Sequence, residues 1–300
     1  MWIRSFFTIL FILTGISSAY SADLTVAVMK SDGHLPYEEV LAGFKAEFQN
    51  RTLKIIILEN GERKSLNAQL SRHQPDIIFC LGTKALEQTS HIKEIPKIFS
   101  LITYAGIQPW LNREDVYGVT LDIAPPLQFK AIRQAFPDSK RIAVIYDPKQ
   151  NQKVITDAKK AAASMGLSLA AYPIDSIKDI PAVFQGLDKN TDLLWSIYDS
   201  IVYQPEPAQY ILLQCLRRQI PFVGFSPQFA RAGALLALYG DYWDMGRQAA
   251  LQAMAIANQR DNISRIIRPR VVRTAVNKKV AQAMRITYPP SFLINVHLSY

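Results

Sequence analysis

The stretch Pro75-Asp76-Ile77-Ile78-Phe79-Cys80-Leu81-Gly82-Thr83-Lys84-Ala85-Leu86 has the pattern of a buried strand that turns into a helix. Ile77 to Leu81 is a continuous apolar run, as a parallel strand shows when both faces of its sheet are covered. Gly82 permits a sharp turn, and Thr83 is a suitable N-cap for a helix that begins at Lys84. The first N–H groups of a helix have no partner within it, so we expect an anionic group to bind at this turn. The alternative is an ordinary structural turn, of which every α/β protein has several.

Strands and helices alternate along the whole chain on both sides of this stretch. Apolar runs predict further strands at 24–29, 53–58, 96–101, 117–121, 141–146, 168–172, 192–197, 221–225, 234–238 and 266–272. Amphipathic or small-residue segments predict helices at 37–49, 62–72, 125–136, 150–165, 207–218 and 277–284, with another after residue 241. Two successive series of similar size predict an α/β fold of two doubly wound, parallel-sheet lobes. The cleft between such lobes is the default binding site.

The places where the series break predict the domain boundaries. Residues 22–121 with 241–272 form the first predicted lobe, and residues 122–240 with 273–300 form the second. We expect hinges at these breaks, near Leu121-Asp122, Gly240-Asp241 and Arg273-Thr274, because hinges absorb backbone change at a few element ends.

The first 21 residues have the pattern of a secretory signal peptide. Arg4 supplies a positive n-region, the apolar run 6–16 is too short to span a bilayer comfortably, and Ala19-Tyr20-Ser21 has the small residues of a cleavage site. An anchor helix is the alternative, and polar residues directly after the run argue against it. No cysteine lies near the cleavage point, so we expect no lipid anchor. The sequence predicts a soluble periplasmic protein that begins near Ala22.

Charge and cysteine content exclude some classes of protein. The formal net charge is +9, but the basic residues are scattered and not interleaved with aromatic ones, so we expect no nucleic-acid partner. Cys80 lies in an apolar run and Cys215 in a helical one. Export permits a disulfide, but these positions favour two buried free thiols.

The sequence shows few features of a catalytic site. The four histidines are isolated and no P-loop, nucleophile elbow or zinc-protease motif is present, so we expect no metal, no cofactor and no enzyme. The best enzymatic alternative is a two-lobed racemase that uses Cys80 and Cys215 as its acid/base pair. That chemistry needs both thiols at strand ends facing one cleft, and the position of Cys215 within a helix argues against it.

Polar residues at the carboxyl ends of the predicted strands are the candidate ligand contacts. In the first lobe these are Ser31, Asp32, Gly82, Thr83, Thr103 and Tyr104, and in the second Asp147, Asn151, Tyr198, Asp199 and Ser226, with Asp241 at a hinge. Each residue has a plain structural alternative as a turn, cap or core residue.

The order of several segments resembles the periplasmic substrate-binding proteins of ABC transporters, in the subfamily that includes tryptophan/tyrosine-type binders. The segments are Leu81-Gly82-Thr83, Arg141-Ile142-Ala143-Val144-Ile145-Tyr146-Asp147-Pro148, Ile220-Pro221-Phe222-Val223, Gly233-Ala234-Leu235, Tyr239-Gly240-Asp241-Tyr242, Gly246-Arg247-Gln248-Ala249-Ala250 and Val276-Asn277-Lys278-Lys279-Val280-Ala281. The resemblance covers about residues 24–295. It implies a type I periplasmic binding fold that encloses its ligand as the lobes close, with a membrane permease and an ATPase as partners.

The resemblance and the strand ends together predict an amino-acid-like ligand or another small carboxylate. The amides of Thr83 and Lys84 are expected to hold its carboxylate, Asp147 or Asp199 an ammonium group, and Tyr104 or Tyr198 an apolar side chain. The segment Ile102-Thr103-Tyr104-Ala105 departs from the Asp-Pro-Val that the family usually shows there, which leaves the ligand's identity open. We expect a monomer. A ligand-sensing module for a membrane receptor remains an alternative.

Overall fold

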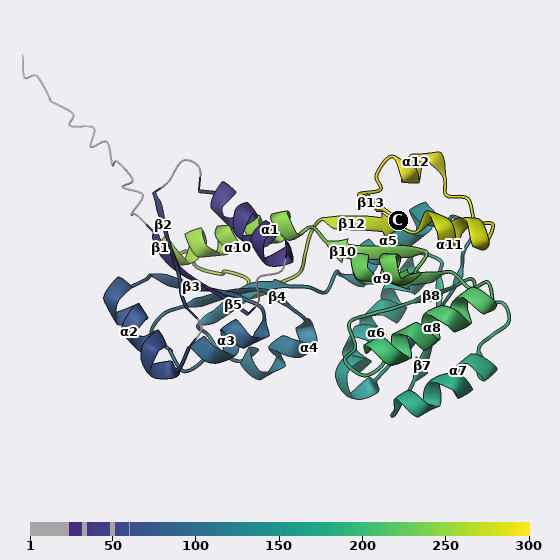
Figure 1. Ribbon diagram of the computed structural model, residues 1–300, viewed down its shortest axis with the longest axis horizontal. Helices are drawn as coiled ribbons and strands as arrows, with labels where there is room; N and C mark the ends of the chain where they lie inside the picture. The colour runs from purple at the N-terminus through teal and green to yellow at the C-terminus, as the bar shows by residue number, and fades with distance from the viewer. Residues whose placement is uncertain (1–23, 32–34, 49–51, 60) are drawn as a thin grey trace, which may run out of the picture.

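A computed structural model describes residues 24–31, 35–48, 52–59 and 61–300. They form two α/β lobes that lie side by side and are joined by chain segments between them (Figure 1). The predicted signal peptide and Asp32 lie outside the described residues. In the part of the chain that is described, no helix is long and apolar enough to cross a bilayer.

Lobe 1 is built on a six-stranded sheet in the order β11-β5-β4-β3-β1-β2, and all of its described strand pairs are parallel. Its strands are β1 (Leu24–Lys30), β2 (Leu53–Ile57), β3 (Ile77–Leu81), β4 (Lys97–Ile102), β5 (Val116–Thr120) and β11 (Ile266–Ile267). Helices α1 (Leu35–Ala46) and α10 (Tyr242–Ala257) pack on one face, and α2 (Arg63–His73), α3 (Thr83–Thr89) and α4 (Tyr104–Ile107) pack on the other. Every residue of β3 is buried, which confirms the prediction made from its apolar run.

Lobe 2 is built on a seven-stranded sheet in the order β13-β12-β10-β9-β8-β6-β7, parallel except where β12 pairs with β10. Its strands are β6 (Arg141–Tyr146), β7 (Ser168–Pro173), β8 (Leu193–Trp195), β9 (Phe222–Gly224), β10 (Leu236–Gly240), β12 (Val272–Val276) and β13 (Leu298–Ser299). One face carries α5 (Pro125–Ala135), α6 (Pro148–Ser164), α11 (Lys278–Ala283) and α12 (Pro290–Leu293), and the other α7 (Ile180–Gly186), α8 (Pro205–Arg217) and α9 (Pro227–Ala232). Short 3-10 turns lie at Gln108–Trp110 and Ile177–Asp179.

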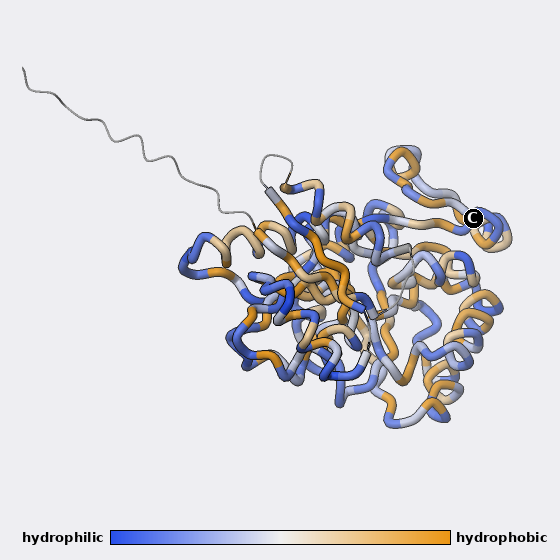
Figure 2. Tube along the Cα trace, turned by 60° about the vertical axis from the view of Figure 1, so that its left-hand side comes forward, coloured by the Kyte–Doolittle hydropathy of each residue, from blue (hydrophilic) through white to orange (hydrophobic). Residues whose placement is uncertain are grey.

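The same strand order, β2-β1-β3-β4 and β7-β6-β8-β9, recurs in the two lobes. Apolar strands run through the interior of each lobe and polar segments lie toward the outside (Figure 2). These observations confirm the predicted fold class of two doubly wound α/β lobes.

Helix α10 returns the chain to lobe 1 and packs directly on α1. A Cβ atom at Gly246 would lie 1.9 Å from the carbonyl oxygen of Val40, and one at Gly43 would lie 1.9 Å from that of Trp243. No side chain fits at either position, so the two glycines allow the helix backbones to touch. This contact anchors the returning chain beside the junction of the lobes.

The prediction of one strand at 266–272 is wrong. Ile266 and Ile267 pair with β5 in lobe 1, whereas Val272 begins β12 in lobe 2. Pro269 lies between them in residues 268–271, which cross from one sheet to the other. The hinge predicted near Arg273-Thr274 is therefore misplaced, because both residues pair with β10 inside lobe 2. The exact lobe boundaries stay a prediction.

Candidate ligand cleft

The carboxyl ends of the parallel strands of both lobes border a pocket between the lobes, which we call the cleft. Its volume is about 420 Å³, which is in the usual range for a small-molecule site. The lining residues are Thr103, Ala105 and Gly106 from lobe 1, and Gln150, Tyr198, Asp199, Ser200 and Phe225 from lobe 2. Three predicted site residues, Thr103, Tyr198 and Asp199, are thus brought together.

The turn after β3 differs in detail from its prediction. Gly82, with φ 86°, is the N-cap residue of α3 and Thr83 is the first helical residue, so the prediction that Thr83 caps the helix is wrong. Ser31 supplies the missing cap, because its Oγ accepts a 2.9 Å hydrogen bond from the Ala85 amide. A Cβ atom at residue 82 would lie 2.7 Å from that Oγ, so only glycine fits. Among the described residues, no acceptor pairs with the amides of Thr83 and Lys84.

The start of α4 lies next to this turn. The Thr103 Oγ1 accepts a 3.0 Å hydrogen bond from the Gly106 amide and so caps α4. A Cβ atom at Gly106 would lie 3.8 Å from the Thr83 Oγ1. The two helix starts are therefore close together. The start of α4 lines the cleft, and Thr83 at the start of α3 lies beside it without lining it.

On the lobe 2 wall, Asp199 makes four hydrogen bonds within the protein. Its Oδ2 accepts from the Asp147 amide at 2.7 Å and from the Asn151 Nδ2 at 2.9 Å. Its Oδ1 accepts from the amides of Ile201 and Val202, both at 3.0 Å. A carboxylate has about four lone-pair sites, and all four are used. Of the two roles considered for Asp199, the hydrogen bonds favour the structural cap over an ammonium ligand.

Asp147 and Asn151 support this wall from behind. The carboxylate of Asp147 caps α6, accepting from the Lys149 amide at 2.9 Å and from the Gln150 Nε2 at 2.7 Å. The Asn151 Nδ2 also donates to the carbonyl oxygen of Tyr198 at 3.1 Å. Asp147 and Asn151 are buried, at 4% and 3% exposure. They hold the cleft-lining residues in place and do not line the cleft themselves.

Beneath the cleft lies a small space of about 20 Å³ that shares Tyr198 and Phe225 with it and is also lined by Asp122 and Arg268. The two rings lie 4.3 Å apart, and the Tyr198 hydroxyl donates to the Phe225 carbonyl oxygen at 3.2 Å. Asp122 accepts a hydrogen bond from the Tyr104 amide. Burial raises the pKa of Asp122 to about 6, although the Tyr104 amide and the Arg268 charge act in the opposite direction.

Asp122 and Arg268, which line this space, are not among the residues predicted from the sequence as ligand contacts. Asp122 follows a predicted strand, so the rule applied to the other strand ends would have found it. Arg268 follows a strand of only two residues, which leaves no periodic pattern to recognise.

Asp241 and Ser226 are two more of the predicted site residues that do not line the cleft. Asp241 caps α10 through the Asp244 amide at 3.1 Å and pairs with the Arg273 Nε at 2.6 Å. It lines a different pocket, of about 510 Å³, between the starts of α1 and α10 and the elements α9, β12 and β13. Ser226 precedes α9, and its side chain does not cap that helix.

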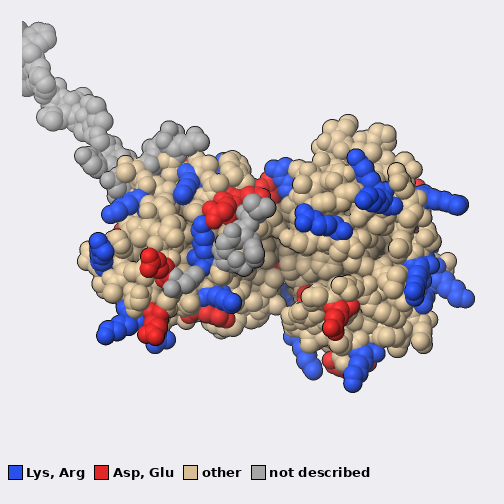
Figure 3. Space-filling view, viewed as in Figure 1, with Lys and Arg blue, Asp and Glu red and all other residues tan. Residues whose placement is uncertain are grey.

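Lysine and arginine side chains are scattered over the face shown in Figure 3 and form no single stripe.

The two thiols lie in different lobes, and both are buried and free, as predicted. Burial raises the pKa of Cys80 to about 12, and its Sγ lies 3.2 Å from the Thr89 Oγ1. Burial also raises the pKa of Cys215 within α8. Because neither thiol lies at a strand end facing the cleft, they do not form the acid/base pair of a racemase.

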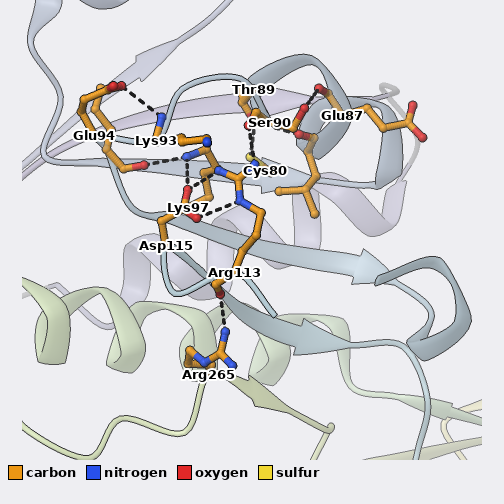
Figure 4. Close-up of polar contacts among 12 residues, drawn as sticks. Cys80, Glu87, Thr89, Ser90, Lys93, Glu94, Lys97, Arg113, Asp115 and Arg265 are labelled. Atoms are coloured by element: carbon orange, nitrogen blue, oxygen red, sulfur yellow. Dashed lines mark hydrogen bonds and ion pairs between the residues drawn. The ribbon is translucent and has the colours of Figure 1, made fainter. Parts of the chain in front are cut away.

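A second polar cluster lies at the amino end of β4, away from the cleft (Figure 4). The Lys97 side chain is fully buried, and its Nζ donates to the Asp115 Oδ2 at 2.7 Å and to the Ile95 carbonyl oxygen at 2.8 Å. The Arg113 Nε donates to the Asp115 Oδ1 at 2.8 Å. These donors and acceptors satisfy one another, so the cluster is structural. Among the described residues, no group of His, Cys, Asp and Glu could hold a metal ion.

Comparison with known proteins adds a family and a fold. The family model "ABC transporter substrate binding protein" matches residues 58–297. No curated protein sequence matches the chain.

Three solved structures have a similar fold. A conserved domain protein from Vibrio cholerae is 20% identical, with 92% of this chain and 99% of that chain covered and a TM-score of 0.59. An ABC domain in complex with L-Trp from Streptococcus pneumonia is 18% identical, with 93% and 100% covered and a TM-score of 0.60. A ligand-free, open substrate binding protein with adhesive properties from Clostridium difficile is 16% identical, with 92% and 98% covered and a TM-score of 0.70. At these identities the likeness shows the fold alone.

Proposed function

Because the chain belongs to the family of ABC transporter substrate-binding proteins, we propose that it binds a small molecule in the cleft and delivers it to a membrane permease and its ATPase. The observation that carries this proposal is the lining of the cleft by residues of both lobes. A ligand seated there contacts both lobes at once, so it favours the arrangement in which they close. The family is one of transport proteins and not of enzymes.

For the ligand we propose a small carboxylate of the amino-acid type. The amides of Thr83 and Lys84 are available at the start of α3, where the helix dipole contributes roughly 0.3–1 kcal/mol toward holding an anion. Tyr198 and Phe225 offer aromatic surface to an apolar side chain. One of the solved structures with this fold is a complex with L-Trp, which makes tryptophan a natural first compound to test.

We also propose that residues 1–21 are a cleaved signal peptide and that the mature protein is a periplasmic monomer beginning near Ala22. The family supports a location outside the cytoplasm. N-terminal sequencing of protein recovered from the periplasm tests the cleavage site. An uncleaved or acylated N-terminus would contradict this part of the proposal.

A thermal-shift screen tests the binding function. The panel contains the twenty standard L-amino acids, other small carboxylates and a set of neutral sugars. A ligand that binds only the folded state at a hundred times its Kd stabilises it by about 2.7 kcal/mol, which raises Tm measurably. We expect one or a few amino acids to raise Tm. If no compound raises it at millimolar concentration, the cleft is not a small-molecule site of this kind.

A further inference from the structure

Asp122 and Arg268 lie on neighbouring segments that join the two lobes. Asp122 closely follows β5 and Arg268 directly follows β11. Ile267 lies opposite Val119 in the register of these two parallel strands, so both segments leave lobe 1 at the same place. Both residues line the space below Tyr198 and Phe225. Any group bound between them would touch the moving part of the molecule.

Asp122 and Arg268 each have polar atoms without a hydrogen-bond partner among the described residues. Within the described residues, no oxygen accepts from the Arg268 guanidinium, which lies 5.9 Å over the Tyr104 ring. The nearby Arg270, by contrast, donates to Asp244 at 2.8 and 2.9 Å. Asp122 uses its Oδ2 to accept from the Tyr104 amide, and its Oδ1 has no described donor. One cation and one carboxylate thus remain available at the small space that adjoins the cleft.

We infer that Asp122 and Arg268 bind the ammonium and the carboxylate of a free α-amino acid, an assignment that rests on the proposed function. The planar guanidinium accommodates a carboxylate through two parallel charge-assisted hydrogen bonds. The amides at the start of α3 are neutral, so Arg268 provides the stronger anchor. The free Oδ1 of Asp122 accepts from the ammonium. The amino-acid side chain then points past Tyr198 and Phe225 into the cleft.

Asp122 is a partly buried carboxylate that lies within reach of the Arg268 charge, although the two form no ion pair among the described residues. Burial disfavours the charged form of Asp122, whereas the Tyr104 amide, the Arg268 charge and the backbone amide of Asp122 favour it. The Tyr198 hydroxyl lies nearby, and burial together with the Asp122 charge raises the pKa of that hydroxyl. Its pKa of about 6 means that an increasing fraction is protonated as the pH falls from 7.5 to 5. An ammonium ligand needs the ionised form, and an amino acid keeps both of its charges over this range. Affinity for the amino acid is therefore expected to fall as the pH falls.

Calorimetric titration of the full chain with matched compounds tests this inference. The probes are the twenty L-amino acids, followed by the amine and the acid that correspond to the tightest binder; for L-tryptophan these are tryptamine and indole-3-propionate. We expect each loss of a charge to weaken binding at least tenfold. At pH 7.5, Arg268→Gln and Asp122→Asn should do the same. The controls Arg260→Gln and Asp261→Asn change exposed charges away from the cleft and should bind like wild type.

Two further readouts separate recognition from a structural role. Asp122→Asn removes a charge that burial disfavours, so the Tm of the unliganded variant at pH 7.5 should not fall. The variant should also lose the pH dependence of affinity between pH 5 and 7.5. Unchanged affinity in Arg268→Gln or Asp122→Asn would overturn the inference, as would equal binding of the amino acid and its deaminated acid. If only sugars bind, the inference fails and the cleft proposal stands; if nothing binds, both fail.

Discussion

The two lobes share a strand order but place their buried polar groups at opposite edges of their sheets. In lobe 1 the fully buried Lys97 and its partly buried partners Asp115 and Arg113 lie at the amino end of β4, away from the cleft. In lobe 2 the buried cluster of Asp147 and Asp199 lies at the carboxyl ends of the strands, beside the cleft. Lobe 2 therefore presents a wall whose polar groups already bind one another, whereas lobe 1 and the crossing segments keep groups available for a ligand.

At the amino ends of the strands, both lobes have a carboxylate that accepts a hydrogen bond from the neighbouring strand. Asp76, directly before β3, accepts from the Thr25 amide at the start of β1 at 2.8 Å. Asp192, directly before β8, accepts from the Arg141 amide at the start of β6 at 2.7 Å. Equivalent strands carry equivalent carboxylates because, in both lobes, the carboxylate accepts from an amide at a strand start that would otherwise be unpaired.

The largest expected effect comes from Asp115→Ala in lobe 1. The substitution leaves the fully buried Lys97 without its carboxylate partner. Removing one partner of a buried ion pair costs about 3–5 kcal/mol of unfolding free energy. Urea unfolding followed by circular dichroism measures the loss.

Asp192→Ala in lobe 2 is the matched comparison for that experiment. Its partner Arg141 has a side chain that is 52% exposed, so the loss should be smaller, about 1–2 kcal/mol. Equal losses of unfolding free energy in the two variants would show that the buried Lys97–Asp115 pair contributes no more stability than the more exposed Arg141–Asp192 pair.

Asp199→Ala should have the next largest effect. It leaves the amides of Asp147, Ile201 and Val202 without their acceptor, and we expect a loss of about 3 kcal/mol in unfolding free energy. Chemical denaturation at neutral pH measures it. Because the side chain supports the cleft wall, ligand affinity should fall as well. A variant as stable as wild type would contradict the view of lobe 2 as a wall held by internal hydrogen bonds.

A smaller effect is expected in acid. Burial alone would raise the pKa of Asp115, but hydrogen bonds from Arg113 and Lys97 outweigh it and lower the pKa to about 2. A carboxylate with a lowered folded-state pKa stabilises the protein above its unfolded pKa and loses that contribution as the pH falls through the folded value. After allowance for solvent screening, about 1 kcal/mol should disappear between pH 4 and pH 2. Urea titrations over this range should show a shallower decline for Asp115→Ala than for wild type.

The sequence predicts the layers of the molecule better than its contacts. The apolar run Ile77–Leu81 needs only local periodicity to be recognised, and it became the buried strand it predicted. The cap of α3 comes from Ser31, more than 50 residues earlier, and no local pattern at Thr83 reveals it. Likewise, the two-residue β11 exists only because β5 offers it a partner, so the crossing at residues 268–271 and the position of Arg268 follow from tertiary pairing.

The role of Asp199 shows a second limit of sequence reasoning. A carboxylate at a strand end has the same pattern whether it binds a ligand or caps a turn. The difference lies in how many of its lone pairs are taken, which depends on Asp147 and Asn151 about 50 residues away. We therefore propose Asp122, which the break in the βα series predicts only as part of a hinge, as the group that binds the ligand's ammonium.

The smallest expected effect concerns the turn after β3. Thr83→Ala removes one hydroxyl beside the cleft and should cost about 1 kcal/mol of ligand affinity. Thr83→Pro removes an amide donor at the first position of α3, where proline is well tolerated, and should weaken binding further without unfolding the lobe. Calorimetry on both variants measures the difference. Wild-type affinity in a folded Thr83→Pro variant would exclude this turn from ligand binding.

Closure of the two lobes on an amino acid is the most direct test of the account as a whole. Small-angle X-ray scattering should be recorded for the mature protein alone and with a saturating concentration of the amino acid that raises Tm most. The account predicts a smaller radius of gyration with the amino acid bound, and no contraction in Arg268→Gln at the same concentration. An unchanged radius in the saturated wild-type protein would contradict a binding site that both lobes enclose.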